Sequence, residues 1–168
     1  MLTDIPAGCN VYMDANILVY HFTEHAQFGQ QATRFLARIA NHELQATTLA
    51  STAAEALHQI TLSEVAKYLG LERSGLLRRL QREPNLLTRL PVPLNVIEET
   101  QAMNVHIEPL STGVVSSAQS HIRELGLLTN DALVIAFMRR RGLSHLATND
   151  DDFDRIAGEV GITIWKPR

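Results

Sequence analysis

The sequence has little of several residue types, and each shortage narrows the class of protein. It holds one cysteine, Cys9, among 168 residues, which excludes an internal disulfide framework and a cysteine-rich zinc site. No apolar run approaches the ~20 residues that a membrane-crossing helix needs. The amino-terminal stretch MLTDIPAGCN carries an acid and lacks the apolar region of a secretory signal. We therefore expect a cytoplasmic protein that does not interact with a membrane.

Two further absences concern ligands. There is no G-x-G-x-x-G loop and no Walker lysine loop, so a nucleotide cofactor has no support in the sequence. The formal net charge is only −3, so the basic excess typical of nucleic-acid-binding domains is missing. That argues only weakly against nucleic-acid binding, because acids gathered at one site offset a basic surface elsewhere.

The composition that remains is that of a globular protein. Hydrophobic residues make up 45% of the chain, which is an ordinary value for a soluble domain. The length predicts one domain spanning residues 1–168, large enough to bury a core.

Short apolar runs alternate along the chain with segments of helical periodicity. The runs predict strands at 9–13, 44–48, 105–110, 144–148 and 161–166. The periodic segments predict helices at 26–41, from 51 or 52 to 60, at 95–104, 113–126 and 130–142, with a pair of helices in 63–90 broken near Gly70 and Pro84. This alternation predicts an α/β fold with a mostly parallel sheet of about five strands.

Four acids stand next to predicted strands or helix starts, far apart in the sequence. Asp14 directly follows the first predicted strand, and Glu55 lies in the first turns of the helix after the second. Asp131 lies at the start of a predicted helix, and Asp150 follows the fourth predicted strand. Ligands of parallel sheets bind beyond the carboxyl ends of the strands. We therefore expect the four carboxylates to meet at one edge of the sheet.

Carboxylates gathered in this way repel one another. Two of them about 4 Å apart repel by roughly 4 kcal/mol at an effective dielectric constant of about 20, so the group needs raised pKa values or a cation. Hard divalent ions, Mg²⁺ or Mn²⁺, suit oxygen ligands. We expect Asp14, Asp131 and Asp150 to hold one or two ions. Glu55 would bind an ion directly or through water, or orient an attacking water.

Each acid also has a simpler explanation when it is taken alone. Thr52 and Glu55 form the T-x-x-E pattern of a helix capping box. Asp131 would be favoured by the positive end of a helix dipole. Asp14 could be a turn residue, and the aspartates of 150–154 could form a solvated loop.

Four motifs, in this order, resemble the PIN-domain nucleases, and most of all the VapC-type toxins of toxin–antitoxin pairs. They are YMDANILVY (12–20), AAEALHQ (53–59), LLTNDALVIA (127–136) and LATNDDDF (146–153). The resemblance implies a three-layer α/β/α sandwich and a Mg²⁺- or Mn²⁺-dependent endoribonuclease. By motif position its four acids are Asp14, Glu55, Asp131 and Asp150, with Asp152 as an additional acid and Asn16 and Thr148 as supporting polar residues.

One departure from the family pattern concerns the last motif. Three consecutive aspartates leave the choice of the fourth acid open among Asp150, Asp151 and Asp152. Motif position favours Asp150.

The resemblance also implies partners. It suggests an RNA substrate, a homodimer, and an antitoxin bound at the leucine-rich helical pair in 63–90, which otherwise reads as core. Arginines in two regions are candidates for contacts with RNA phosphates, although solvated faces and helix ends explain them equally well. They are Arg78, Arg79, Arg82, Arg139 and Arg140.

Two other functions stay open at this stage. The chain could be a PIN nuclease of RNA processing without an antitoxin, or a catalytically silent scaffold that binds RNA or protein. The presence of all four acids favours an active enzyme over the scaffold.

Overall fold

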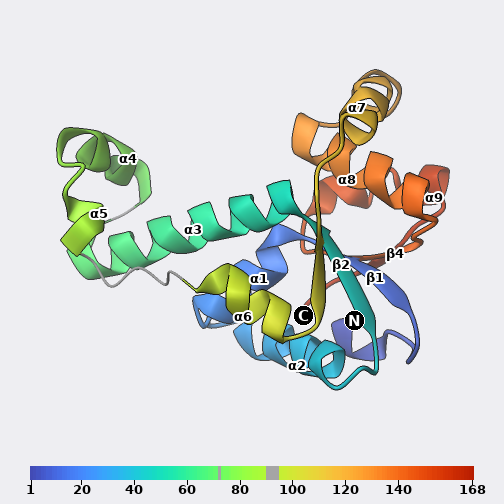
Figure 1. Ribbon diagram of the computed structural model, residues 1–168, viewed down its shortest axis with the longest axis horizontal. Coiled ribbons are helices and arrows are strands. Elements are labelled where there is room, and N and C mark those ends of the chain that lie inside the picture. Colours follow the sequence, from blue (N-terminus) through green and yellow to red (C-terminus); the bar gives the residue numbers. More distant parts are fainter. Residues whose placement is uncertain (72, 90–94) are drawn as a thin grey trace.

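The computed structural model describes residues 1–71, 73–89 and 95–168 (Figure 1). Within them one sheet has five parallel strands in the order β3-β2-β1-β4-β5. The strands are β1 Asn10–Met13, β2 Gln45–Leu49, β3 Val105–Glu108, β4 His145–Ala147 and β5 Thr163–Trp165. All five predicted strands are confirmed, and the sheet is wholly rather than mostly parallel in this part of the chain.

Helices connect the strands, as parallel pairing requires. They are α1 Ala15–Phe22, α2 Gly29–Ala40, α3 Ala50–Leu69, α4 Arg73–Arg82, α5 Leu86–Arg89, α6 Val96–Ala102, α7 Thr112–Leu125, α8 Thr129–Arg141 and α9 Ala157–Val160. Two short 3₁₀ helices, η1 Leu2–Asp4 and η2 Asp151–Phe153, complete the described elements. No helix among the residues described combines the length and apolar character that a membrane span demands.

The sheet separates two apolar layers because successive side chains of a strand point to opposite faces. Val11 and Met13 of β1 pack in the layer formed with α1, α2 and α6. Tyr12 between them packs in the layer formed with α7 and α8, with its ring 5.7 Å from that of Phe137. Figure 1 shows the two sets of helices on opposite sides of the sheet. The expected three-layer sandwich is confirmed.

Helix α1 was not predicted from the sequence. It begins directly after Asp14, and its buried residues are Ala15, Ile17 and Leu18. The segment is apolar almost all round, so it lacks the polar face that makes helical periodicity visible.

Helix α3 is longer than predicted and runs unbroken through the expected gap after Ile60. Its second half carries Leu62 and Val65, which are buried against Leu76 of α4. It ends at Gly70, whose φ of +60° provides the left-handed cap. We call residues 61–71 and 73–89 the arm, because Figure 1 shows α4 and α5 at the far end of α3, away from the sheet. The predicted pair of helices extended to residue 90, which lies outside the described residues.

Candidate active site

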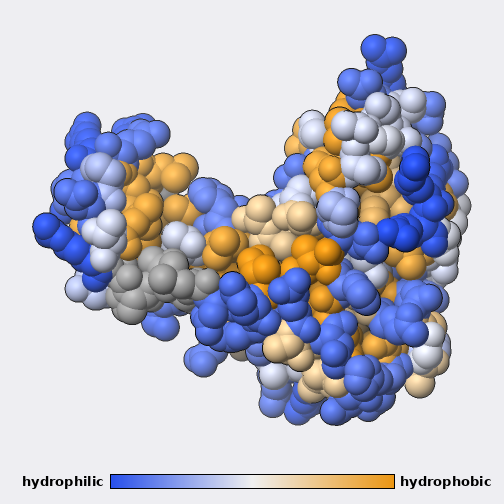
Figure 2. Space-filling model, in the orientation of Figure 1, coloured by the Kyte–Doolittle hydropathy of each residue, from blue (hydrophilic) through white to orange (hydrophobic). Residues whose placement is uncertain are grey.

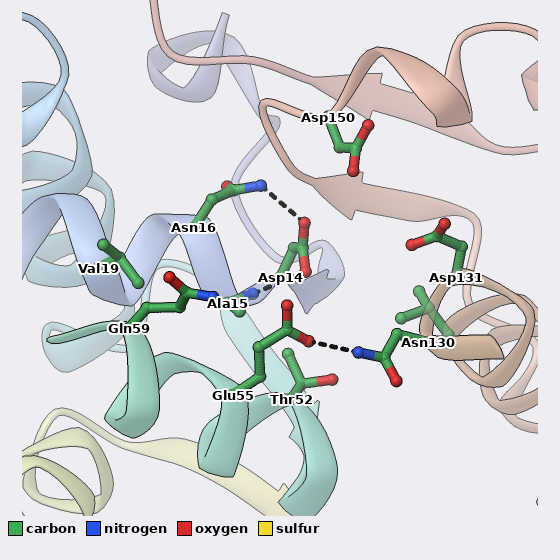
Figure 3. A pocket seen from close by; sticks show the side chains of 11 residues that line it. Asp14, Ala15, Asn16, Val19, Thr52, Glu55, Gln59, Asn130, Asp131 and Asp150 are labelled. Atoms are coloured by element: carbon green, nitrogen blue, oxygen red, sulfur yellow. Dashed lines mark hydrogen bonds between the residues drawn. The ribbon is translucent and has the colours of Figure 1, made fainter. Parts of the chain in front are cut away.

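The four predicted acids line one pocket at the carboxyl ends of β1, β2 and β4 (Figure 3). The cavity has a volume of about 280 Å³. It is lined by Asp14, Ala15, Asn16, Val19, Thr52, Glu55, Gln59, Asn130, Asp131, Val134 and Asp150. Acids that lie far apart in the sequence, from the end of β1 to the end of β4, thus meet at the edge where a parallel sheet binds its ligands.

Asp14 is held by three hydrogen bonds. It is the N-cap of α1, so its Oδ1 accepts a 2.7 Å bond from the backbone N–H of Ala15. Its Oδ2 accepts from the Nδ2 of Asn16 at 2.7 Å and from the Oγ1 of Thr148 at 2.6 Å. Asp14 is therefore a helix N-cap rather than the turn residue considered from the sequence, and its carboxylate lies at the pocket (Figure 3).

Thr148 connects the ends of β1 and β4 from a fully buried position. Besides donating to Asp14, its hydroxyl accepts from the Nδ2 of Asn16 and from the backbone N–H of Asp150, both at 3.0 Å. One donor and two acceptor positions are thereby all used. The two predicted supporting residues, Asn16 and Thr148, meet at the same carboxylate.

The three consecutive aspartates point to different partners. Asp150 lines the pocket, and its Oδ1 accepts a 2.9 Å bond from the backbone N–H of Asp152. Asp151 is exposed and forms an ion pair with Lys166, which also pairs with Asp154. Asp152 is exposed and does not line the pocket. This arrangement favours Asp150 as the fourth acid, as motif position did.

Glu55 lies on the second turn of α3, and the capping-box explanation for it is wrong. The N-cap of α3 is Leu49, and no side chain caps the helix. Thr52 instead forms a buried 2.7 Å hydrogen bond with the hydroxyl of Tyr12. The Oε2 of Glu55 accepts a 2.9 Å bond from the Nδ2 of Asn130, across the pocket (Figure 3).

Two carboxyls of the pocket have raised pKa values. Burial raises the pKa of Asp14 to about 6 against the opposing bonds from Thr148 and Ala15, and the charges of Glu55 and Asp150 add to the rise. Burial also raises the pKa of Asp131 to about 6, and its acidic neighbours add to it. Those neighbours are Asp150, Asp14, Asp152 and Glu55. The four acids therefore act on one another electrostatically, as expected for carboxylates that share a site.

The donor set fits a hard divalent cation. Every acid of the pocket offers oxygen, and no sulfur or imidazole lines the cavity. As the side chains of the described residues stand, no three His, Cys, Asp or Glu residues are grouped closely enough to hold an ion. Binding would therefore require carboxylates to turn inward, which a cation would favour by offsetting their repulsion.

Sequence reasoning overlooked Gln59 and Asn130 as pocket residues, and it gave Thr52, which also lines the pocket, only a helix-capping role. Gln59 lies one turn after Glu55 on α3, and the i, i+4 spacing on a helix was the available signal. Asn130 precedes Asp131, and the adjacency alone did not show that it would bind Glu55 from 75 residues away.

The arginines predicted to contact RNA lie away from the pocket. Arg78, Arg79 and Arg82 are exposed on α4 of the arm, where Arg79 pairs with Glu83 at 3.0 Å. Arg139 and Arg140 lie at the end of α8 opposite to Asp131. Asp131 and Arg139 are eight positions apart on the helix, which corresponds to about 12 Å along its axis. None of the five arginines lines the pocket.

Together, the parallel sheet and the four carboxylates at its edge define an α/β protein with an acidic pocket suited to a divalent ion. The family model of the PIN domain matches residues 11–159, which include all four acids. The chain therefore belongs to the PIN-domain family, and the resemblance seen in the four motifs is confirmed.

Several solved structures share this fold. A toxin–antitoxin complex from Klebsiella pneumoniae has a chain 18% identical, with a TM-score of 0.52 over 91% of this chain and 95% of that one. VapC20 of Mycobacterium tuberculosis, a toxin that cleaves the sarcin–ricin loop, is 13% identical, with a TM-score of 0.54 over 86% and 92%. VapBC2 of Rickettsia felis, bound to a DNA fragment from its promoter, is 16% identical, with a TM-score of 0.50 over 95% of this chain and 99% of that one. A comparison with curated proteins gives no match.

Proposed function

We propose that this protein is a divalent-metal-dependent endoribonuclease that acts in the cytoplasm as the toxin of a toxin–antitoxin pair. The observation that carries the proposal is the meeting of Asp14, Glu55, Asp131 and Asp150 in one pocket of a PIN domain. The raised pKa values of Asp14 and Asp131, caused first by burial and then by the neighbouring acids, support the proposal, because a cation would stabilise the charged carboxylates.

The residues have distinct roles in this proposal. Asp14, Asp131 and Asp150 would hold one or two Mg²⁺ or Mn²⁺ ions, with Asp152 adding negative charge from outside the pocket. A bound ion of this kind acidifies water and offsets the charge that develops on a phosphate during hydrolysis. Asn16 and Thr148 fix the carboxylate of Asp14 through their hydrogen bonds.

Glu55 is proposed to orient the attacking water and to accept its proton, or to hold an ion itself. Asn130 binds Oε2 of Glu55, so Oε1 is the atom placed to accept a proton. A carboxylate within hydrogen-bond reach of the attacking water is what general base catalysis requires.

The substrate proposed is RNA, with the arginines of the arm as distant phosphate contacts. Arg78, Arg79 and Arg82 are exposed on α4, and phosphate neutralisation supplies much of the affinity for nucleic acids. Arg139 and Arg140 stay weaker candidates, because Arg139 contacts His121 and Arg140 packs against Gly113.

The arm is proposed as the binding surface of an antitoxin. Four apolar side chains of the arm are exposed by 41–65%: Tyr68, Leu71, Leu77 and Leu87. Figure 2 shows apolar surface on the arm beside the hollow between it and the rest of the molecule. A groove of this kind suits the apolar face of a partner helix. The structural relatives from toxin–antitoxin complexes support this proposal, and the family resemblance also favours a homodimer.

Cleavage of RNA tests the catalytic proposal. Purified protein is incubated with total RNA and Mg²⁺, Mn²⁺ or EDTA, beside Asp131→Asn and the matched control Asp154→Asn, whose carboxylate pairs with Lys166 outside the pocket. We expect metal-dependent cutting by the parent and the control, and none by Asp131→Asn. Intact RNA in every reaction of a folded parent would favour the silent scaffold, and equal cutting by both variants would remove support for the site.

A further inference from the structure

Three aromatic rings form a cluster at the turn between α1 and α2. The ring of Tyr20 lies 4.8 Å from that of His25 and 5.0 Å from that of Phe28. His25 and Phe28 stack with their centroids 5.2 Å apart and their planes inclined by 7°. Aromatic residues make up only 5% of the chain, so two of them and a histidine in mutual contact are a notable concentration.

The cluster is attached to the acidic pocket. Tyr20 follows Asn16 by one turn of α1, so both side chains lie on one face of that helix. Asn149 contacts both, with its backbone N–H donating to Oδ1 of Asn16 at 3.2 Å and its Nδ2 donating to the hydroxyl of Tyr20 at 2.9 Å. Asn149 directly precedes Asp150. The rings therefore adjoin the wall of the pocket that Asn16 and Asp150 form.

The cluster is accessible to solvent, and hydrogen bonds hold it in place. His25 is exposed, and Tyr20 and Phe28 are half-buried. The Nδ1 of His25 accepts long hydrogen bonds from the backbone N–H groups of Gln27 and Phe28, at 3.4 and 3.3 Å. The backbone N–H of His25 donates to the carbonyl of Tyr20 at 3.0 Å. The bonds to Nδ1 orient the imidazole, and the backbone bond holds the turn that carries it, which lowers the entropic cost of binding.

We propose that this cluster is a stacking platform for an unpaired base of the RNA, next to the nucleotide whose phosphate lies in the acidic pocket. Proteins that bind single-stranded RNA stack bases on Phe, Tyr, Trp or His rings, and such stacking accepts every base because each has a π face. The proposal rests on the proposed function, because it assumes that the pocket receives an RNA phosphate. It adds a base-stacking subsite beside the phosphate site, and this subsite would accept any unpaired base.

An abasic scan in the Asp131→Asn background tests the platform without requiring cleavage. The probe is a fluorescent unpaired oligoribonucleotide, in which one base at a time is removed while the phosphate backbone stays complete. Anisotropy titrations compare Asp131→Asn alone, the same protein with His25→Ala, and the matched control His106→Ala, an exposed histidine on β3. Stacking on one ring is worth about 1–3 kcal/mol, so His25→Ala should weaken binding by about 5- to 150-fold.

The decisive result is a loss of additivity. If His25 stacks on a base, removing that base weakens binding by the Asp131→Asn protein but has little further effect once His25→Ala is present. His25→Phe keeps a ring and should keep most of the affinity, which separates stacking from damage to the fold. Three results would overturn the platform. They are full affinity after His25→Ala, equal losses at every abasic position in both proteins, and no binding of unpaired RNA by the Asp131→Asn protein. Coupling between ring and base with no cleavage by the unmutated protein would keep the platform and refute the nuclease instead.

Discussion

The hydroxyl of Thr148 donates a 2.6 Å hydrogen bond to Oδ2 of Asp14, across 134 residues of sequence. The same hydroxyl accepts the backbone N–H of Asp150. One buried side chain thus sets the positions of two acids at the ends of neighbouring strands, β1 and β4. The proposed metal site therefore depends on a residue that carries no charge.

Replacing this hydroxyl should weaken metal binding more than it changes the fold. Thr148→Val keeps the shape of the side chain and removes every hydrogen bond that its oxygen makes, so we expect Mn²⁺ affinity to fall by about 10- to 100-fold. Thr148→Ser keeps the oxygen and should stay close to the parent. Calorimetric titration with Mn²⁺ measures both. Equal affinities for the Val and Ser variants would show that the hydroxyl does not organise the site.

Of the consecutive aspartates, Asp150 should be essential for RNA cleavage and Asp151 should be dispensable. Asp150→Asn removes a pocket acid, and we expect cleavage to fall by about 100-fold or more. Asp151→Asn removes an exposed partner of Lys166, and surface ion pairs contribute little. Initial rates of RNA cleavage distinguish the two variants. A greater loss of cleavage in Asp151→Asn than in Asp150→Asn would show that Asp150 is not the fourth acid.

The buried pair of Tyr12 and Thr52 should stabilise the start of α3. The hydroxyl of Tyr12 bonds Thr52 at 2.7 Å and accepts the backbone N–H of Leu49 at 3.3 Å, while burial raises its pKa to about 12. Tyr12→Phe leaves both partners unsatisfied, so we expect the free energy of unfolding to fall by about 1–3 kcal/mol in denaturant titrations. Adding Thr52→Val should cost less than the sum of the single changes, and simple additivity would contradict the pairing.

The raised pKa values predict how stability depends on pH and metal. The pKa values of Asp14 and Asp131 rise from 3.8 to about 6 on folding. Between these values the folded protein holds more protons than the unfolded one, so the contribution of these groups to the free energy of unfolding falls as pH rises through this range. Above about pH 6 both acids are charged and a cation offsets their repulsion.

Thermal unfolding with and without Mg²⁺ checks this prediction. The increase in Tm caused by Mg²⁺ should be larger at about pH 7.5 than at about pH 5, because protons compete with the ion for the carboxylates. The Asp131→Asn variant should show a smaller increase at the higher pH. The same increase at both pH values would mean that Mg²⁺ stabilises the protein at another place.

Local sequence patterns predicted the sheet and missed interactions formed over long distances. The five strands lie in short segments between stretches of helical periodicity, so each was visible by itself. The course of α3 through residues 61–63 was not visible, because it depends on Leu62 and Val65 packing against Leu76 of another helix. Helix α1 lacked a polar face and was overlooked for that reason.

The same division applies to the pocket. The positions of the four acids after strands and at helix starts predicted their meeting, since parallel strands end at one edge. The hydrogen bonds and ion pairs that position these acids could not be predicted from the residues next to them in the sequence. Asn130 reaches Glu55, and Lys166 draws Asp151 and Asp154 away from the pocket, only because the fold brings these segments together.

Direct measurement of Mn²⁺ binding tests the central claim, that the four carboxylates form one cation site. The signal of free Mn²⁺ in electron paramagnetic resonance is followed while the ion is titrated into the parent, Asp131→Asn and Asp151→Asn. We predict one or two bound ions in the parent and in Asp151→Asn, with at least one site lost in Asp131→Asn. Binding that is unchanged in Asp131→Asn, or absent from a folded parent, would contradict the account.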